Sequence, residues 1–461
     1  MIAPRTQRLR DPVHGLIVFQ RDQPVDQLAW ALVDTPEFQR LRRIRQLGVA
    51  EFVFPSATHT RFAHSVGVFH TARSLIDIIR RELKETKEAF NEKRADVAAI
   101  AALLHDLGHG PFSHTFESVQ KSRGIVRKHE QWTADIIRNK DGGILPLLEA
   151  HRPGFAEEVA TLVSAEDPSD IYHAVVSSSL DADRLDYIRR DRLMTGTGAG
   201  AIDFDWVMEH IRVRPIEIDA VDSDIMADAV SVPTFCLDSK ALPAAEQFLL
   251  ARFTLHEQVY FHKATRCVEH MIARLLRLLA DRARESETAP ATTGLPAEHS
   301  LLRFFRAGLA TVEDYLALDD TVITAALGPM QTASHADIAD LAKRLQNRNL
   351  YKTLDLRAFG EDEEKQTRRA RRIDQEFKAK SMAGTVIKDA GAAISIYTQI
   401  GGDDEKVHKK LHILDPAEGP REITVLSGMI RSLLAKRQFT RYYFADKADR
   451  KKALQRTGGT R

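Results

Sequence analysis

The chain has 461 residues, carries a formal net charge of +1 at pH 7, and contains 43% hydrophobic and 28% charged residues. This length predicts two or three domains at about 150 residues each, and the near-zero charge excludes a global field that would attract nucleic acid or an anionic membrane. Two cysteines exclude a disulfide framework, and we find neither a signal-peptide core nor an apolar run of about 18 residues that could span a bilayer, so we expect a soluble cytoplasmic protein without a membrane partner.

Amphipathic patterns predict helices along most of the chain, after a short strand at 16–19. Thr35-Pro36 opens a helix whose apolar positions share one face as far as Leu47. Further helices are predicted at 65–83, 96–107, 131–138, 171–192, 244–281 and 300–318. The segment 96–107 is apolar on nearly all sides, which indicates a buried central helix.

The C-terminal part of the chain has a different pattern. A polar stretch at 285–299 predicts a loop or boundary. A mostly charged segment at 361–382 predicts a solvated helix, and the alternating runs at 385–426 predict a small β region. We therefore predict a mainly α fold, with a helical-bundle core over 1–285, a helical extension over 286–360, and a smaller α+β C-terminal lobe over 361–461.

Histidines concentrate between residues 54 and 130, at positions 59, 64, 70, 105, 109, 114 and 129. One of them, His105, is followed by Asp106 at the end of the buried apolar helix. A buried carboxylate is costly unless a positive group pairs with it, and a divalent metal would supply that charge. Imidazole and carboxylate ligands suit Mn, Fe, Zn, Ni or Co, and suit Mg less well.

An acidic stretch at 177–191 contains Asp181, Asp183, Asp186 and Asp191 among arginines. Taken alone, it fits a charged helix face held by pairs three and four residues apart. Taken together with the upstream histidines, one of these aspartates is a candidate for a further metal ligand.

The order His64, His105-Asp106, Asp183 resembles the HD phosphohydrolase superfamily. The run HDLGHGPFSH at 105–114 further resembles the deoxynucleoside-triphosphate triphosphohydrolases, especially the mammalian enzyme that carries an added SAM domain. Matching runs are RDPVHG at 10–15, DTPEFQRLRRIRQLG at 34–48, FPSATHTRFAHSVGV at 54–68, LDADRLDYIRRD at 180–191 and RNLYK at 348–352. The resemblance covers roughly 8–355 and implies an HD core without the SAM domain.

This resemblance implies a metal-dependent hydrolase that cleaves dNTPs to deoxynucleoside and tripolyphosphate. The metal ligands would be His64, His105, Asp106 and Asp183. The catalytic residues would be His109, His114, Glu117, His129 and Glu130. We favour His114 as the general acid and Glu117, which stands where the family usually has Asp, as the group that orients it. Lowering dNTP levels would suit nucleotide balance or antiviral defence.

Substrate binding is implied for Gln46, Leu47, Arg61, Arg184, Tyr187, Asp191, Arg252, Tyr260 and His262. Leu47 would exclude a 2′-hydroxyl by bulk and by offering it no hydrogen bond, although a helix end in the core is the alternative explanation for Gln46 and Leu47. The resemblance also implies allosteric activation by a nucleotide, through a homo-oligomer (dimer or tetramer), with Asp34, Gln39, Arg42 and Arg348 as regulatory contacts.

Two other hypotheses remain open. The same metal centre would serve an HD nuclease or phosphatase that acts on nucleic-acid ends, in which case the closed sugar pocket of Leu47, Tyr187 and Asp191 would be irrelevant. The basic stretches at 368–380 and 447–456 motivate a nucleotide-controlled nucleic-acid-binding scaffold, whose binding would weaken steeply with salt and would survive His105→Ala.

Overall fold

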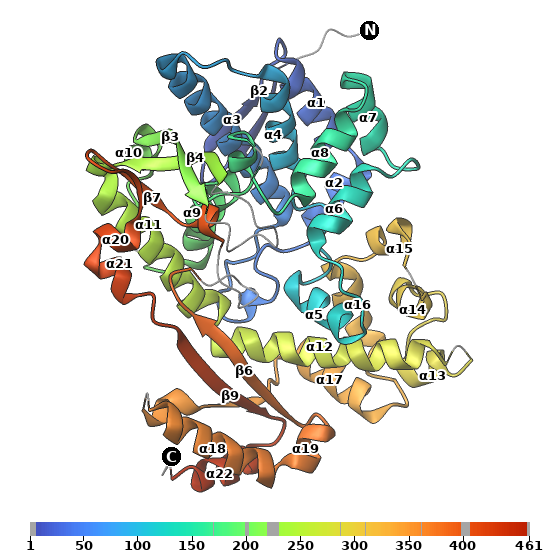
Figure 1. Ribbon diagram of the computed structural model, residues 1–461. Helices are drawn as coiled ribbons and strands as arrows, with labels where there is room; N and C mark the ends of the chain where they lie inside the picture. Colours follow the sequence, from blue (N-terminus) through green and yellow to red (C-terminus); the bar gives the residue numbers. More distant parts are fainter. Residues whose placement is uncertain are drawn as a thin grey trace.

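The computed structural model describes residues 6–168, 170–198, 202–218, 230–285, 287–308, 310–360, 362–397 and 406–458. Helices form most of this structure, which confirms the predicted mainly α fold class, and small sheets lie at its sides (Figure 1). Within these ranges, no helix combines the length and apolar character that crossing a bilayer would require.

The N-terminus forms the hairpin of β1 (Gln7–Asp11) and β2 (Gly15–Phe19), which confirms the predicted strand. Helices α1 (Pro24–Val33) and α2 (Pro36–Arg40) follow, and the Thr35 hydroxyl caps α2. The predicted continuation of this helix to Leu47 is wrong. After the 3₁₀ turn Leu41–Arg43 the backbone becomes extended at Ile44, and Arg45 bridges to Thr60.

The core around His105 and Asp106, the HD pair, consists of long helices that pack directly on one another. Helix α3 (Arg61–Thr86) contacts both α4 (Glu92–Leu104) and α9 (Ala182–Thr195). Helix α4 is buried from Val97 to Leu104, as its apolar sequence predicts. It ends three residues before the predicted end, so His105 and Asp106 lie in the turn that follows. The neighbouring helices are α5 (His114–Ser122), α6 (His129–Ile137), α7 (Ile144–His151), α8 (Phe155–Ser164) and α10 (Phe204–Glu209).

The predicted helix 244–281 is two helices. Helix α11 (Leu242–Leu255) runs into a π-helical turn, His256–Tyr260, and α12 (Lys263–Ala283) begins after His262, whose ring caps it. A second apolar core surrounds α12. Its helices are α14 (Ser300–Arg306), α15 (Val312–Leu316), α16 (Asp320–Met330) and α17 (Ala336–Gln346), while the short α13 (Ala289–Thr293) lies in the predicted loop.

Two sheets connect the C-terminal part to the rest. One has the order β3 (Ile211–Ile218), β4 (Val230–Asp238), β7 (His412–Asp415), β8 (Gly419–Glu422), and the other has the order β5 (Lys352–Asp355), β9 (Arg437–Phe444), β6 (Val386–Ile394). The predicted β region at 385–426 is confirmed by β6, β7 and β8. Because β7 pairs in parallel with β4, the C-terminal chain returns to the helical core. The short helices α20 (Ile423–Leu426) and α21 (Gly428–Ser432) follow β8.

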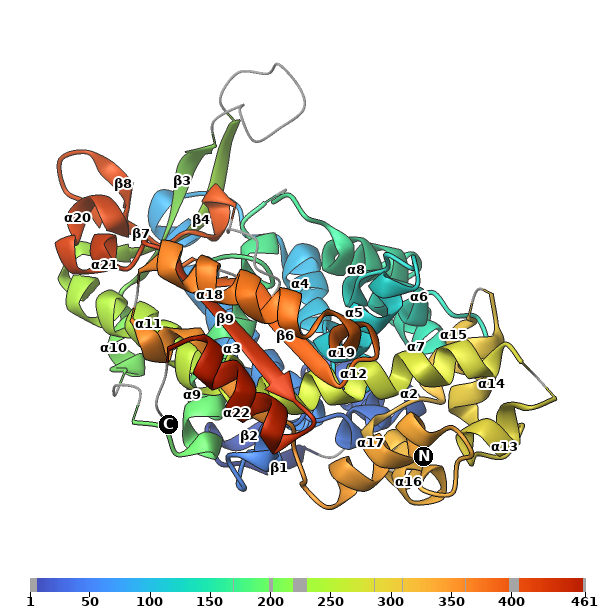
Figure 2. The same ribbon diagram turned by 90° about the horizontal axis from the view of Figure 1, so that it is seen from below.

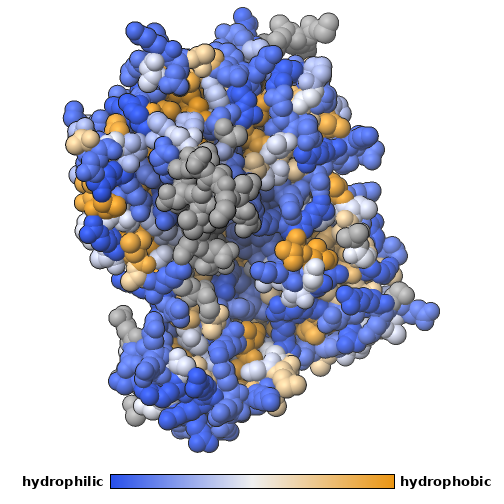
Figure 3. All heavy atoms as spheres, viewed as in Figure 1, coloured by the Kyte–Doolittle hydropathy of each residue, from blue (hydrophilic) through white to orange (hydrophobic). Residues whose placement is uncertain are grey.

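The sheet β5–β9–β6 is covered on one side by α18 (Glu363–Glu376), α19 (Lys378–Met382) and α22 (Lys447–Arg456), as seen from below in Figure 2. This part of the surface is strongly hydrophilic (Figure 3). The predicted domain boundaries at 285 and 360 stay a prediction. Buried residues of the C-terminal part, such as Ile394, Ile413 and Phe439, belong to the same apolar core as α3 and α4.

Candidate metal centre and active site

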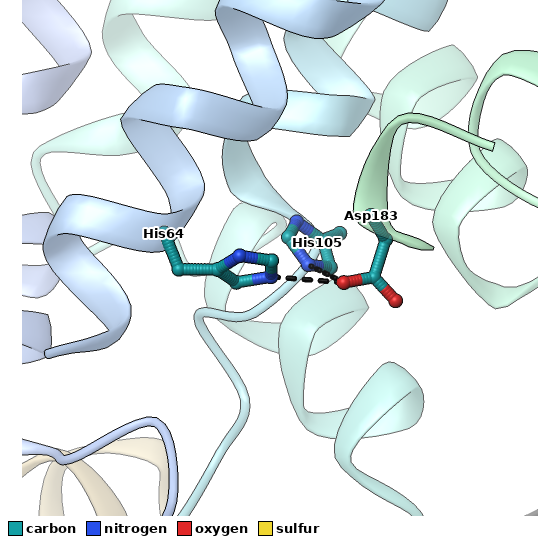
Figure 4. Close-up of side chains that lie close together, drawn as sticks. All are labelled: His64, His105 and Asp183. Atoms are coloured by element: carbon teal, nitrogen blue, oxygen red, sulfur yellow. Dashed lines mark ion pairs between the residues drawn. The ribbon is translucent and has the colours of Figure 1, made fainter. Parts of the chain in front are cut away.

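Three of the four predicted metal ligands converge at one point. His64 comes from α3, His105 from the turn after α4, and Asp183 from the first turn of α9 (Figure 4). One ligand atom from each lies within 4.8 Å of the others. Asp183 Oδ1 is 2.9 Å from His64 Nε2 and 3.8 Å from His105 Nε2.

Hydrogen bonds behind the two histidines fix which ring nitrogen faces this point. His105 Nδ1 donates to the Ala102 carbonyl at 2.8 Å, and His64 Nδ1 donates to Asp186 Oδ2 at 2.8 Å. In the neutral rings each Nε2 would therefore present its lone pair to the centre, and both Nε2 atoms are buried without a hydrogen bond. Oriented imidazoles of this kind, together with a carboxylate, fit a divalent transition metal.

The carboxylate of Asp106 lies at the edge of this group. Its Oδ1 is 3.2 Å from His105 Nε2, and its Oδ2 is 3.8 Å from His64 Nε2. Oδ2 also accepts a 2.6 Å hydrogen bond from Arg61 Nη1. Burial alone would raise the pKa of Asp106, but Arg61 and the two nearby histidines, His105 and His109, hold it well below its ordinary value. Asp106 is therefore an anion that can face a cation.

The centre attracts positive charge. Burial disfavours the imidazolium form of His64, yet the nearby carboxylates of Asp183 and Asp186 raise the pKa of His64 to about 10. The same two carboxylates that would stabilise a proton on this ring also favour a metal cation at its Nε2 face.

The predicted catalytic histidines form a second group beside the metal centre. Glu117 joins two of them, because its Oε2 lies 3.0 Å from His114 Nδ1 and its Oε1 lies 2.8 Å from His129 Nδ1. His109 stacks on His129 with ring centroids 3.9 Å apart, and its Nε2 lies 3.2 Å from Asp106 Oδ1. Glu130 Oε1 is 3.5 Å from His129 Nε2.

Burial and neighbouring charges shift the pKa values of His109 and Glu117 in this group. Burial and the positive charge of Arg61 hold the pKa of His109 well below its ordinary value, so His109 is neutral. Burial alone would raise the pKa of Glu117, but the hydrogen bonds from His114 and His129 lower it far below the usual range. The extra methylene of Glu117, relative to the Asp expected from the resemblance, does not prevent contact with His114.

An unusual backbone conformation places His114 at the start of α5. Phe112 and Ser113 have φ of +52° and +53°, a left-handed region that costs free energy for residues other than glycine. The turn before them requires Gly108 for a different reason, since a Cβ there would lie 2.0 Å from the His129 carbonyl oxygen. The turn after the HD pair is therefore pressed against α6.

A separate hydrogen-bonded group surrounds Asp191, one of the predicted sugar contacts. Its Oδ2 accepts from the Tyr260 hydroxyl at 2.7 Å, and its Oδ1 is 2.8 Å from His59 Nε2. Tyr187 lies one turn earlier on α9, with its ring centroid 6.5 Å from that of Tyr260. The backbone N–H of Gln46 donates to the His59 carbonyl at 3.0 Å, so Gln46 and Leu47 adjoin this group.

The predicted cationic contacts are already engaged by protein groups. Arg61 donates to Ser113 Oγ at 2.8 Å as well as to Asp106. Arg252 donates to the Ile396 carbonyl at 2.7 Å, and Arg184 to the Lys409 carbonyl at 3.4 Å. His262 belongs neither to the histidine group around Glu117 nor to the group around Asp191. Its ring caps α12 and packs edge-on against the ring of Phe54.

The predicted regulatory residues lie at the protein surface. Gln39 Oε1 accepts from Arg42 Nε at 2.8 Å, and the Arg42 guanidinium stacks on Phe62. Asp34 ends α1 close by in sequence. Arg348, which is remote in sequence from the other three, has φ of +52° and donates to the Phe52 carbonyl.

Sequence reasoning missed three residues that contact the site. His59 is not among the predicted site residues, but it pairs with Asp191. Asp186 and His14 were not selected as site residues, yet Asp186 contacts both His64 and His14. The three-residue spacing between Asp183 and Asp186 was the available signal, because that spacing puts both carboxylates on the same side of a helix.

Comparison with protein families matches residues 61–188 to the HD domain and residues 225–292 to an HD-associated region. The chain therefore contains an HD domain. Its fold agrees with this assignment: a phosphohydrolase from Bacteroides thetaiotaomicron superposes with a TM-score of 0.70 at 24% identity, over 95% of this chain and 100% of the other.

Among relatives of this HD-domain protein, the uncharacterized protein YwfO of Bacillus subtilis is 28% identical over 93% of this chain and 89% of its own length. A deoxynucleoside triphosphate triphosphohydrolase SAMHD1 homolog of Dictyostelium discoideum is 29% identical over 75% of this chain. The HD-domain protein spans only 60% of that second relative's length, so the relative's activity is a basis for a proposal only.

Proposed function

We propose that this HD-domain protein is a metal-dependent dNTP triphosphohydrolase. The observation that carries the proposal is the arrangement along α9, where Asp183, Tyr187 and Asp191 follow at intervals of four residues and so share one helix face. One end of this face meets the two metal-facing histidines. The other end meets the hydrogen-bonded group of Tyr260 and His59. A phosphate site and a sugar site on one helix suit a nucleoside triphosphate.

The metal would be held by His64, His105 and Asp183, with Asp106 beside them, and when bound it would polarise the α-phosphate and lower the pKa of a water. The protein's own residues would do the rest. Attack by water at the α-phosphorus forms one P–O bond and breaks the bond to the 5′-oxygen, so the products are tripolyphosphate and a deoxynucleoside.

The leaving 5′-oxygen needs a proton, and His114 is the residue suited to give it. Its side chain is 44% exposed, whereas that of His109 is 4% exposed. Glu117 holds His114 at Nδ1, which leaves Nε2 free to donate to the leaving oxygen. His129 holds the other oxygen of Glu117 and so keeps this carboxylate in place.

Recognition of the sugar would come from the group around Asp191, and discrimination against ribose from Leu47. A carboxylate that already accepts from Tyr260 and His59 is fixed in orientation and can accept further from a 3′-hydroxyl. Gln46 Oε1, which is buried without a hydrogen-bond partner, offers another acceptor close by. Leu47 offers no polar group to a 2′-hydroxyl.

Shortening Leu47 is expected to relax the preference for dNTPs over NTPs. In Leu47→Ala the ratio of kcat/KM values for dNTP and NTP should fall by about 10-fold to 100-fold, because space opens where a 2′-hydroxyl would lie. The measurement is kcat/KM for a dNTP and for the corresponding NTP, each at a saturating metal concentration. Leu16→Ala, at an exposed leucine of β2, is the matched control and should keep the wild-type ratio.

A product analysis tests the proposed function. The purified protein is incubated with each dNTP and NTP, singly and in pairs, with Mn²⁺ or Mg²⁺, and the products are separated by ion exchange. Deoxynucleoside and tripolyphosphate are expected, and they should disappear in Asp106→Ala. Release of single phosphates, or no turnover in any mixture, would contradict the proposal and direct attention to nucleic-acid ends.

Activation by a nucleotide through a homo-oligomer is part of the proposal. Its support is the position of Arg42 and Arg348, which are exposed, and of Gln39, which is half-buried beside Arg42. Pairs of nucleotides should then be hydrolysed faster than either nucleotide alone, and light scattering should show a larger particle. Arg42→Ala should lose this response and keep its affinity for metal.

A further inference from the structure

The imidazole of His64 lies between two carboxylates of the same helix. Asp183 Oδ1 is 2.9 Å from Nε2, and Asp186 Oδ2 is 2.8 Å from Nδ1. Both aspartates belong to α9 and are separated by three residues, which is about one helical turn. One carboxylate therefore belongs to the metal-facing side of the ring, and the other lies behind it.

Asp186 is itself held from several directions. Its Oδ1 lies 2.6 Å from His14 Nε2, and Arg190 donates to both of its oxygens at 2.7 and 2.9 Å. Arg190 also donates to Asp11 Oδ2 at 2.7 Å. Asp186 is completely buried and Arg190 is 1% exposed. This carboxylate has no freedom to rotate without breaking several charge-assisted hydrogen bonds.

The opposing helix is shaped to fit this carboxylate. On α3, one turn after His64, stands Gly67, and a Cβ built there would lie 2.1 Å from Asp186 Oδ1 and 2.4 Å from Arg190 Nη2. Gly67 has no positive φ that would otherwise require glycine. The absence of a side chain at Gly67 thus makes room for the Asp186–Arg190 pair directly behind His64.

We propose that Asp186 is the positioning residue of the metal centre and that the β1–β2 hairpin supports it. Asp186 would fix the His64 tautomer and ring orientation, while His14 and Asp11, in and beside the turn between β1 and β2, hold Asp186 and Arg190. This deepens the proposed function but concerns metal binding alone, so it does not depend on which phosphate ester is cleaved.

The test is a titration of the protein with Mn²⁺ in the absence of nucleotide. The electron paramagnetic resonance signal of the free ion is recorded at each point and gives the dissociation constant for Mn²⁺. Asp186→Asn should weaken Mn²⁺ binding by about 10-fold to 100-fold, the usual effect of losing such a partner behind a ligand. Asp183→Ala serves as the reference for loss of a ligand. Glu82→Gln is the matched control: Glu82 is also a buried carboxylate at α3, 2% exposed, but it pairs with Arg214 away from the centre.

Two further variants keep the test decisive if Asp186→Asn fails to fold. Gly67→Ala should weaken Mn²⁺ binding because its methyl group displaces the Asp186 carboxylate, and His14→Gln should weaken it by a smaller factor. Wild-type affinity in all the folded variants would overturn the proposal, even if dNTPs are hydrolysed. Weakened affinity in a protein that does not hydrolyse dNTPs would uphold it and reject the proposed substrate.

Discussion

Replacing Asp183 by alanine is expected to lower the turnover number on dNTPs by about 10³-fold or more. Asp183 is the carboxylate of the three-residue group, and a metal contributes several kcal/mol of transition-state stabilisation at about 1.36 kcal/mol for each factor of ten. The measurement is the initial rate of tripolyphosphate formation at saturating dNTP and Mn²⁺. The side chain is 38% exposed, so its removal leaves no closed cavity in the core.

The matched control is Asp205→Ala, at an exposed aspartate of α10 that no metal-facing group contacts among the described residues. It should retain wild-type turnover. If Asp183→Ala also retained turnover with a wild-type affinity for Mn²⁺, this residue would not be a ligand, and the metal centre would have to be built from other groups.

Replacing His114 by asparagine is expected to lower kcat by about 10²-fold to 10⁴-fold, the range for loss of a general acid, with a smaller change in KM. The reason is that His114 would protonate the 5′-oxygen only as the P–O bond breaks. Glu117→Gln should reduce kcat less, because it only weakens the hold on the His114 ring. Steady-state kinetics on one dNTP measures both.

A substrate whose leaving group needs no proton separates this role from a structural one. With p-nitrophenyl triphosphate, the wild type and His114→Asn should differ much less than they do with a dNTP. His151→Gln is the control and should behave as wild type on both substrates, because His151 lies beside Asp96 in the N-terminal half of α4, whereas His105-Asp106 follows the C-terminal end of that helix. Equal losses on the two substrates would show that His114 does not act as the acid.

Local sequence patterns predict those parts of the site that depend on residues close together in the sequence. The apolar run of α4 predicts burial, so the polar pair His105-Asp106 at its end had to meet a charged partner. Helix periodicity likewise predicts α3, although Arg61 begins it four residues earlier than expected. The fold class agrees with this reasoning. The choice of His64 and Asp183 rests on the family resemblance, and in the structure both side chains lie close to His105.

Features that depend on distant residues were not predictable in the same way. His59 and Asp191 are 132 residues apart and pair only after α9 packs near α3. The pairing of β4 with β7 joins segments that no local pattern links. The π-helical turn His256–Tyr260 lies within a sequence that predicts one continuous helix over 244–281, and the hydrogen bond of Tyr260 with Asp191 accompanies the break.

The most direct test of the proposed reaction is hydrolysis of a dNTP in ¹⁸O-labelled water, followed by ³¹P nuclear magnetic resonance and mass spectrometry of the products. Attack at the α-phosphorus predicts tripolyphosphate with one ¹⁸O on a terminal phosphate, together with an unlabelled deoxynucleoside, and neither should form in Asp183→Ala. Labelled orthophosphate or pyrophosphate, with a nucleotide as the other product, would contradict the proposed function of this site.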